Sequence, residues 1–311
     1  MKLIFMGTPE FAVPTLDALL NSQHSVLSVV TAPDKPSGRG LKLKPSPVKA
    51  FAIENHLTVL QPEKLKEQAF IRQLHQFAAD VYVVVGFRIL PPAVFTIPPK
   101  GTINLHASLL PRYRGAAPIS WAIMKGETKT GATVFFIDEK VDTGKLIIQD
   151  SIPIHDEDDA GTLHDRLMHM GASLVLKAVN MIADNTVRQR EQTGTITLAP
   201  KINREHCQID WSKDTATIYN QIRGLSPYPA AFSLLGGKVF KIFKSKALHA
   251  LPEANAACGE ICEVDRKAGL IRVVAADGYI DILELQLEGR RRMTSEEFLR
   301  GHDLQQHQRF Q

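Results

Sequence analysis

Two polar side chains alternate with apolar ones in the segment Thr-Ile-Asn-Leu-His at residues 102–106. On a β-strand, residues i and i+2 point to the same face, so Asn104 and His106 would point together. An amide and an imidazole that both direct a hydrogen towards one oxygen atom suit the stabilisation of a developing oxyanion. A polar pair that merely caps the end of a strand has the same pattern, so the sequence leaves both interpretations open.

A carboxylate follows at Asp142, in a segment (residues 138–146) expected to join two strands. Asp142 could orient His106 at the same edge of the sheet, or accept a proton through a water molecule. Asp before Thr-Gly is also typical of an Asx turn, which is the competing interpretation. One imidazole, one amide and one carboxylate are a poor ligand set for zinc, so we expect no metal.

Other kinds of chemistry leave no signature in the chain. The sequence contains no G-x-S-x-G, H-E-x-x-H or Walker motif. Gly7-Thr8-Pro9 lacks the spacing of a dinucleotide-binding loop and predicts a simple strand-to-helix turn. The three cysteines cannot all pair and have no zinc-like spacing, which indicates reduced thiols in a cytoplasmic protein: they are Cys207, Cys258 and Cys262.

The candidate residues need a β-sheet to position them, and the sequence of residues 1–185 predicts such a sheet. Short apolar runs alternate with helical patterns, which predicts an α/β domain with a doubly wound, mostly parallel, Rossmann-like sheet. The predicted strands cover residues 2–6, 25–31, 80–86, 101–106, 132–137 and 146–154, and the predicted helices cover 11–20, 49–55, 63–77 and 161–183. Ligands bind such sheets at the carboxyl ends of the strands.

A second domain is expected after residue 204, because residues 186–204 are polar and aperiodic and have the character of a linker. Residues 205–311 hold one helical stretch and about five short strands, at 215–223 and at 231–235, 238–243, 259–264, 270–275 and 279–285. Gly236-Gly237 and Asp277-Gly278 favour hairpins. A small OB-like β-barrel is the expected fold.

Composition and charge narrow the class of protein. Of the 311 residues, 44% are hydrophobic and 23% are charged, which is typical of a globular protein. No apolar run approaches the roughly 18 residues of a membrane-spanning helix, and no secretory signal is evident. We therefore expect a cytoplasmic protein without membrane contact. We also expect a monomer, although no feature of the sequence determines the oligomeric state. The net charge of +4 is small, so a nucleic-acid partner would be held by local patches.

Two groups of cations could form such patches. The segment 35–49 contains no acidic residue and carries Lys35, Arg39, Lys42, Lys44 and Lys49. The second domain carries Lys238, Lys241, Lys244, Lys246 and then Arg290, Arg291 and Arg292. Alternate lysines on a strand share a face and would suit a phosphate backbone. A solvated charged surface without a partner is the competing interpretation.

Four co-linear motifs resemble the signature of folate-dependent formyltransferases. They are the Asn104-x-His106 pair, the loop Ser108-Leu109-Leu110-Pro111, the Arg-Gly-Ala-Ala-Pro at 114–118, and Val141-Asp142-Thr143-Gly144. Similarity to that family, and within it to the members that act on methionyl-tRNA, extends from residues 7–9 through 33–40 to Ile-Asp-Trp-Ser at 209–212. Arg88 stands where an apolar or small residue is expected, and residues 301–311 match no part of the pattern.

The resemblance implies an enzyme that uses 10-formyltetrahydrofolate to formylate methionyl initiator tRNA for translation initiation. It implies that Asn104 and His106 stabilise the oxyanion and that Asp142 assists His106 and proton transfer. The implied folate contacts are Val85, Gly86, Phe87, Leu90, Ser108, Leu109, Leu110 and Pro111. The implied tRNA contacts are Lys35, Arg39, Lys42, Lys44, Lys238, Lys241, Arg290 and Arg291. The alternatives are a formyltransferase for a nucleotide sugar or glycinamide nucleotide, and a catalytically silent RNA-binding protein.

Overall fold

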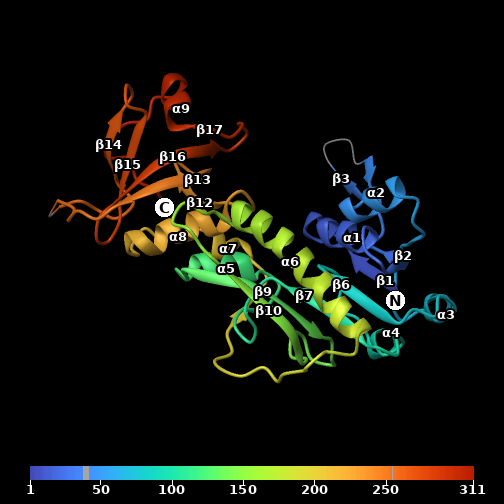
Figure 1. Ribbon diagram of the computed structural model, residues 1–311. Coiled ribbons are helices and arrows are strands. Elements are labelled where there is room, and N and C mark those ends of the chain that lie inside the picture. The colour runs from blue at the N-terminus through green and yellow to red at the C-terminus, as the bar shows by residue number, and fades with distance from the viewer. Residues whose placement is uncertain (38–41, 254) are drawn as a thin grey trace. The chain divides into compact units, whose positions relative to one another are not determined.

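The computed structural model describes residues 1–37, 42–253 and 255–311, and the chain divides into two compact units whose elements are labelled in Figure 1. The first unit contains residues 1–115, 130–152 and 164–199, and the second contains 116–129, 153–163 and 200–311. Most of the expected linker, residues 186–199, therefore packs with the first unit. The expected domain boundaries, with one domain ending at residue 185 and the other beginning at residue 205, remain a prediction.

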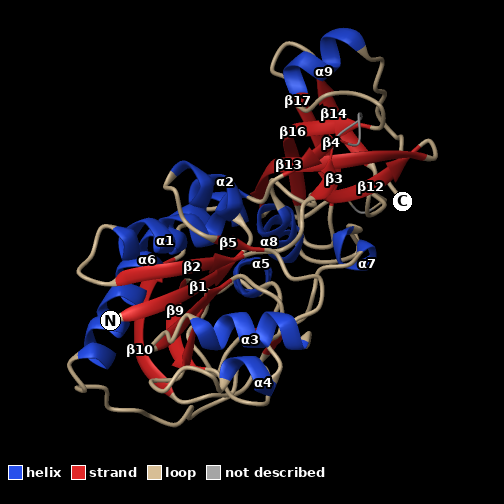
Figure 2. Ribbon diagram, turned by 90° about the vertical axis from the view of Figure 1, so that its right-hand side faces the viewer, coloured by secondary structure: helices blue, strands red, loops and turns tan. Residues whose placement is uncertain are grey.

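A twisted sheet forms the centre of the first unit (Figure 2). It has seven strands in the order β10-β9-β7-β6-β1-β2-β5. Neighbouring strands from β5 to β7 are parallel, and β9 is antiparallel to β7. The strands are β1 (Lys2–Gly7), β2 (Ser25–Val30), β5 (Val59–Leu60), β6 (Val81–Val85), β7 (Thr102–His106), β9 (Lys129–Phe136) and β10 (Leu146–Pro153). The predicted doubly wound, mostly parallel sheet is confirmed; β5, only two residues long, was not predicted.

Helices cover both faces of this sheet. They are a 3-10 turn (Glu10–Ala12), α1 (Val13–Leu20), α2 (Pro47–Glu54), α3 (Gln68–Gln76), α4 (Pro92–Phe95) and α6 (Ala160–Ala183). Residues of α3 and α4 share an apolar cluster with Ile4 and Val84 of the sheet. On the other face, Gly171 of α6 lies so close to Leu105 that a Cβ atom would sit 2.7 Å from its Cδ2. No helix among the described residues has the length and apolarity to cross a membrane.

Helix α3 begins five residues later than expected because Arg88 occupies the preceding turn. The Arg88 guanidinium donates hydrogen bonds to the carbonyl oxygens of Pro62 (2.7 Å) and Glu63 (2.9 Å). Those carbonyls face Arg88, and residues 62–67 contain a bend and a turn in place of a helix. Helix α4 was not predicted, since its four residues carry no helical periodicity.

The basic segment after β2 contains a hairpin where a loop was expected. Strands β3 (Lys35–Ser37) and β4 (Lys42–Lys44) pair antiparallel, with Lys35 opposite Lys44. At its base, Lys49 Nζ lies 2.5 Å from Asp34 Oδ2, and this hydrogen bond lowers the pKa of the Asp34 carboxyl. Lys49 is therefore an internal anchor and not one of the free cations of the hairpin.

The second unit contains an antiparallel sheet with the order β12-β13-β16-β15-β14, and β17 pairs with β16. The strands are β12 (Ala231–Leu235), β13 (Lys238–Leu248), β14 (Ile261–Asp265), β15 (Leu270–Val274), β16 (Tyr279–Leu287) and β17 (Met293–Thr294). The helices are α5 (Pro118–Met124), α7 (Arg204–Cys207), α8 (Thr215–Leu225) and α9 (Ser295–Gly301). Of these helices, only α8 was predicted.

The last five residues close the second sheet. Leu234 of β12 and Gln311 exchange two backbone hydrogen bonds, of 3.1 and 2.9 Å. On its other side the same segment bonds to the start of β14, through Phe310 N to Gly259 O and Ile261 N to Gln308 O. Phe310 is 2% exposed and stacks on Trp211 in the core. The tail, which the sequence left unassigned, thus joins the two edges into the expected barrel-like fold.

Candidate active site

Strand β7 carries Asn104 and His106 to the carboxyl end of the parallel strands. Asn104 is paired in register with Val84, whose face is covered by α3 and α4. His106 is 7% exposed, whereas Asn104 is half-buried. The side chain of Asn104 makes no hydrogen bond with any residue that the structure describes. Its amide therefore caps nothing and is available to a ligand.

A backbone carbonyl fixes the orientation of His106. The His106 Nε2 atom lies 2.8 Å from the carbonyl oxygen of Tyr113. Because a carbonyl oxygen can only accept, Nε2 carries the hydrogen, and Nδ1 is the ring nitrogen left for chemistry. Tyr113 has a φ of +58°, a left-handed conformation that is unusual for a bulky side chain and occurs mainly at constrained sites.

Asp142 approaches that second nitrogen. Its Oδ2 atom is 3.7 Å from His106 Nδ1, and both side chains are about nine-tenths buried. The same oxygen accepts a hydrogen bond from the backbone N–H of Gly115 at 2.9 Å. At 3.7 Å the contact with His106 is one of charge and not a hydrogen bond. The Asx-type contact considered for Asp142 belongs to Asp138, whose Oδ1 accepts from the backbone N–H of Lys140.

The loop that follows β7 is held by two polar residues that sequence reasoning missed, the buried Thr133 and the half-buried Gln149. Thr133 Oγ1 donates to the Ser108 carbonyl at 2.6 Å and accepts from the Leu110 N–H at 3.1 Å. Gln149 Nε2 donates to the Leu110 carbonyl at 2.9 Å. Of the predicted folate contacts here, Leu109 is half-buried, and the others are buried: Ser108, Leu110 and Pro111. The three buried side chains leave little surface that a ligand could contact.

The other predicted folate segment offers free backbone groups. The backbone groups of residues 87–89 make no hydrogen bond within the described chain. Gly86 is exposed with a φ of +56°, and a Cβ atom there would lie 2.7 Å from Pro9 Cγ. Phe87 is half-buried, and the flanking Val85 and Leu90 are core residues. Burial lowers the pKa of the Arg88 guanidinium, whose bonds fix one side of this segment.

Three of the predicted tRNA contacts of the first unit, Lys35, Lys42 and Lys44, lie on β3 and β4. Lys35 and Lys44 are exposed, and neither forms an ion pair with a described residue. Lys42 is part of β4. Arg39 lies outside the described residues.

The predicted tRNA contacts of the second unit fall into free and engaged cations. Lys238 and Arg290 are exposed, with no side-chain partner among the described residues, as are Lys244 and Lys246. Lys241 is half-buried and donates to the Pro229 carbonyl at 3.2 Å. Arg291 pairs with Glu297 at 3.2 Å, and Arg292 pairs with Glu284 at 2.5 Å over the Phe243 ring. Identical residue types therefore differ in their freedom to bind phosphate.

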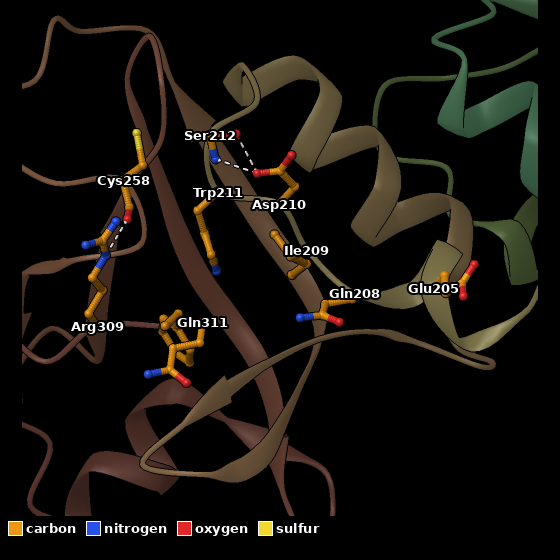
Figure 3. Close-up of a pocket in the computed structure, with 10 residues that line it drawn as sticks. Glu205, Gln208, Ile209, Asp210, Trp211, Ser212, Cys258, Arg309 and Gln311 are labelled. Atoms are coloured by element: carbon orange, nitrogen blue, oxygen red, sulfur yellow. Dashed lines mark hydrogen bonds between the residues drawn. The ribbon is translucent and has the colours of Figure 1, made fainter.

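A pocket of about 490 Å³ lies elsewhere, in the second unit (Figure 3). Its polar groups bond to one another: Asp210 accepts from Ser212, and Arg309 Nε donates to the Cys258 carbonyl. The Ser212 hydrogen bond also lowers the pKa of Asp210. None of the predicted catalytic or tRNA-binding residues lines this pocket. Within the described ranges, no cluster of three or more His, Cys, Asp or Glu side chains could hold a metal ion.

Known families match both parts of the chain. The family described as "Formyl transferase" matches residues 1–179, and "Formyl transferase, C-terminal domain" matches residues 201–303. The methionyl-tRNA formyltransferase of Bacteroides thetaiotaomicron is 45% identical over 317 residues, which cover 98% of this chain and 96% of the relative. That of Flavobacterium johnsoniae is 46% identical over 307 residues, with 97% and 96% covered.

Solved structures share the fold. WlaRD, a sugar 3N-formyltransferase solved in the presence of dTDP and 5-N-formyl-THF, superposes with a TM-score of 0.68. The superposition covers 94% of this chain and 99% of WlaRD. The sequences are 21% identical, so this likeness concerns architecture and not the acceptor.

Proposed function

This chain belongs to the formyltransferase family, among the methionyl-tRNA formyltransferases, and we propose that its first unit transfers the formyl group of 10-formyltetrahydrofolate to the amino group of methionyl initiator tRNA. One observation carries the chemistry: the Asn104 amide shares a strand face with His106, whose Nδ1 lies 3.7 Å from the Asp142 carboxylate. The product would be N-formylmethionyl-tRNA for translation initiation.

The reaction begins when the neutral amine of the methionyl group attacks the formyl carbon. Charge then develops on the formyl oxygen, and the Asn104 amide and the Nδ1–H of protonated His106 donate to it. Nε2 cannot take this role because it is bound to the Tyr113 carbonyl. The Asp142 carboxylate, with its Oδ2 3.7 Å from Nδ1, places a negative charge beside the donating ring. No covalent bond to the enzyme is required.

Proton transfer falls to Asp142. The attacking nitrogen must lose a proton as the new C–N bond forms, and the leaving nitrogen of the folate must gain one as the old bond breaks. Asp142 accepts the first proton and returns it to the leaving nitrogen, so the carboxylate ends unchanged. The Gly115 N–H, which donates to Oδ2 at 2.9 Å, holds the carboxylate in place for both transfers.

The folate would bind along residues 86–90, beside the loop of Ser108 to Pro111. Free backbone groups at 87–89 provide donors and acceptors for the edge of a flat heterocycle. The exposed Gly86, with a φ of +56°, turns the chain at the start of this segment. Ile89 is 76% exposed and offers an apolar surface at the same place.

The tRNA would be held by cations that have no partner in the described chain. In the first unit these are Lys35 and Lys44 of the hairpin. In the second unit they are Lys238, Lys244, Lys246 and Arg290. We also retain Arg39 and Lys42 as proposed contacts, and we assign Lys241 and Arg291 a lesser part because each already has a protein partner. Contacts to phosphate supply most of such affinity and make it depend on salt.

The experiment is to incubate the protein with 10-formyltetrahydrofolate and methionyl initiator tRNA and to measure the fraction of blocked amino groups. A dTDP-linked amino sugar and a glycinamide nucleotide serve as alternative acceptors. Rapid blocking of the tRNA, dependent on the folate, is the expected result. Transfer to the sugar or to the glycinamide nucleotide alone would contradict the proposed acceptor, and tRNA binding without transfer would indicate a silent RNA-binding protein.

A further inference from the structure

Residues 190–199, here called the strap, run across both loops of the candidate site. Arg190 exchanges two backbone hydrogen bonds with Leu146, of 2.8 and 3.0 Å, just beyond the loop that carries Asp142. At its other end the strap forms β11 (Leu198–Ala199), which pairs in parallel with β8 (Arg114–Gly115). The polar segment expected to be a linker is therefore part of the architecture of the site.

The side chain of Gln192 uses its full hydrogen-bonding capacity at the centre of the strap. Its Nε2 donates to the carbonyl oxygens of Asp142 and Gly144, each at 2.9 Å. Its Oε1 accepts from the Nε and NH2 groups of Arg114, at 3.2 and 2.6 Å. Carbonyls only accept and guanidinium groups only donate, so the orientation of the amide is unambiguous.

A second strap residue holds the partner of His106. The Tyr113 N–H donates to Thr197 Oγ1 at 2.8 Å, and the Arg114 N–H donates to the Thr197 carbonyl at 2.9 Å. Tyr113 and Asp142 both have left-handed backbones, with φ of +58° and +56°. Such conformations persist only where surrounding bonds enforce them. The strap supplies bonds to both, on either side of the His106–Asp142 contact.

We propose that Gln192 is a positioning residue for formyl transfer: its amide fixes the Asp142 loop and, through Arg114, ties that loop to the turn that holds His106. The inference rests on the function proposed above. Gln192 does not touch the reacting atoms; it sets where the Asp142 carboxylate stands. Because displacement of a catalytic group by about 1 Å can cost as much as 10²-fold in rate, loss of this amide should lower kcat.

The decisive variant is Gln192→Glu, which exchanges one nitrogen for oxygen. It keeps the acceptor that faces Arg114 but turns an oxygen towards the Asp142 and Gly144 carbonyls, where it can only repel. We expect kcat to fall by about tenfold or more, with KM for folate and for tRNA changed by less than about threefold. Gln192→Met, which removes the bonds without repulsion, should give a smaller loss of the same kind. The matched control is Gln189→Ala, an exposed strap neighbour without a side-chain partner in the described chain, which should leave kcat unchanged.

A double-mutant cycle separates positioning from general stability. In an Asp142→Asn background, Gln192→Glu should cost less than about threefold, since the group it positions is already disabled. Full multiplicativity, or a Gln192→Glu enzyme with normal kcat, would overturn the inference. If Gln192→Glu does not fold, the same two criteria apply to Gln192→Met. Failure of the proposed function is distinguishable, because the unmodified protein would then not formylate methionyl-tRNA at all.

Discussion

The Nε2 atom of His106 and the carbonyl oxygen of Tyr113 lie 2.8 Å apart, seven residues along the same chain. This bond turns the other ring nitrogen, Nδ1, towards Asp142. One nitrogen of the imidazole is therefore engaged by the backbone, and the other is the one to which the proposed mechanism assigns the chemistry. Substitutions that imitate only one of the two nitrogens can test that division of roles.

At His106, we expect the two amide replacements to differ. His106→Asn places a donor near the position of Nδ1, whereas His106→Gln places one near Nε2. If Nδ1 donates to the oxyanion, the Asn variant should retain more activity than the Gln variant. His106→Ala should lower the single-turnover rate by at least about 10²-fold, the usual effect of losing one oxyanion donor. A Gln variant faster than the Asn variant would reverse the assignment of the nitrogens.

The loop of Ser108 to Pro111 should depend on a single hydroxyl. Thr133→Val keeps the shape of the side chain but leaves the Leu110 N–H and the Ser108 carbonyl without their buried partner. We expect a loss of about 2–3 kcal/mol in the free energy of unfolding, measured in urea, and a higher KM for folate. Thr96→Val, which removes one exposed hydroxyl bond, is the control and should change stability by less than about 0.5 kcal/mol. Equal effects of the two substitutions would contradict this role for Thr133.

Local patterns in the sequence predict the sheet, but they do not predict the hydrogen bonds that hold the loops of the candidate site together. The run at Val81–Val85 and the alternation at Thr102–His106 show strands directly, because burial on one or two faces leaves a periodic signature. Every residue has a backbone carbonyl, so the sequence does not indicate that the carbonyl of Tyr113 binds His106. Gln192 lies in a polar aperiodic segment, and its four bonds depend on which distant loops that segment meets.

The cationic residues show the same limit of sequence patterns. Arg290 and Arg292 are two positions apart, yet only Arg292 meets Glu284 and the Phe243 ring. Those partners come from β16 and β13, whose pairing is long-range. A prediction from residue type alone therefore counts engaged and free cations together.

Arg290 and Arg292 should consequently respond differently to removal. Arg290→Ala should weaken tRNA binding and reduce the slope of log affinity against log salt by about one unit, as expected for one phosphate contact. Arg292→Ala should act mainly on the stability of the second unit and leave the salt slope nearly unchanged. Filter binding at several salt concentrations measures both. An unchanged slope for Arg290→Ala would remove that residue from the proposed tRNA surface.

The tail should be required for the stability of the second unit. Phe310→Ala removes a ring that is 2% exposed and contacts both Trp211 and Phe240. The expected loss is about 3–5 kcal/mol, as for other buried aromatic residues. Both tryptophans belong to the second unit, so tryptophan fluorescence during urea unfolding reports on that unit. His307→Ala, which breaks an exposed contact with Glu260 on the same tail, should have little effect. A similar result for both substitutions would show that the tail does not close the core.

Asp142 and His106 should behave as one catalytic unit. Asp142→Asn removes the negative charge but keeps an oxygen that can accept from the Gly115 N–H, so the loop should stay in place. We expect the single-turnover rate to fall by about 10²- to 10⁴-fold, the range for loss of a general acid–base group, with tRNA and folate affinities nearly unchanged. Once His106 is also replaced by Ala, the charge has no imidazolium to stabilise. The double variant should therefore lose less than the product of the two single losses. Strict multiplicativity of the two effects would mean that Asp142 acts on the amine proton alone, independently of the nitrogen 3.7 Å away.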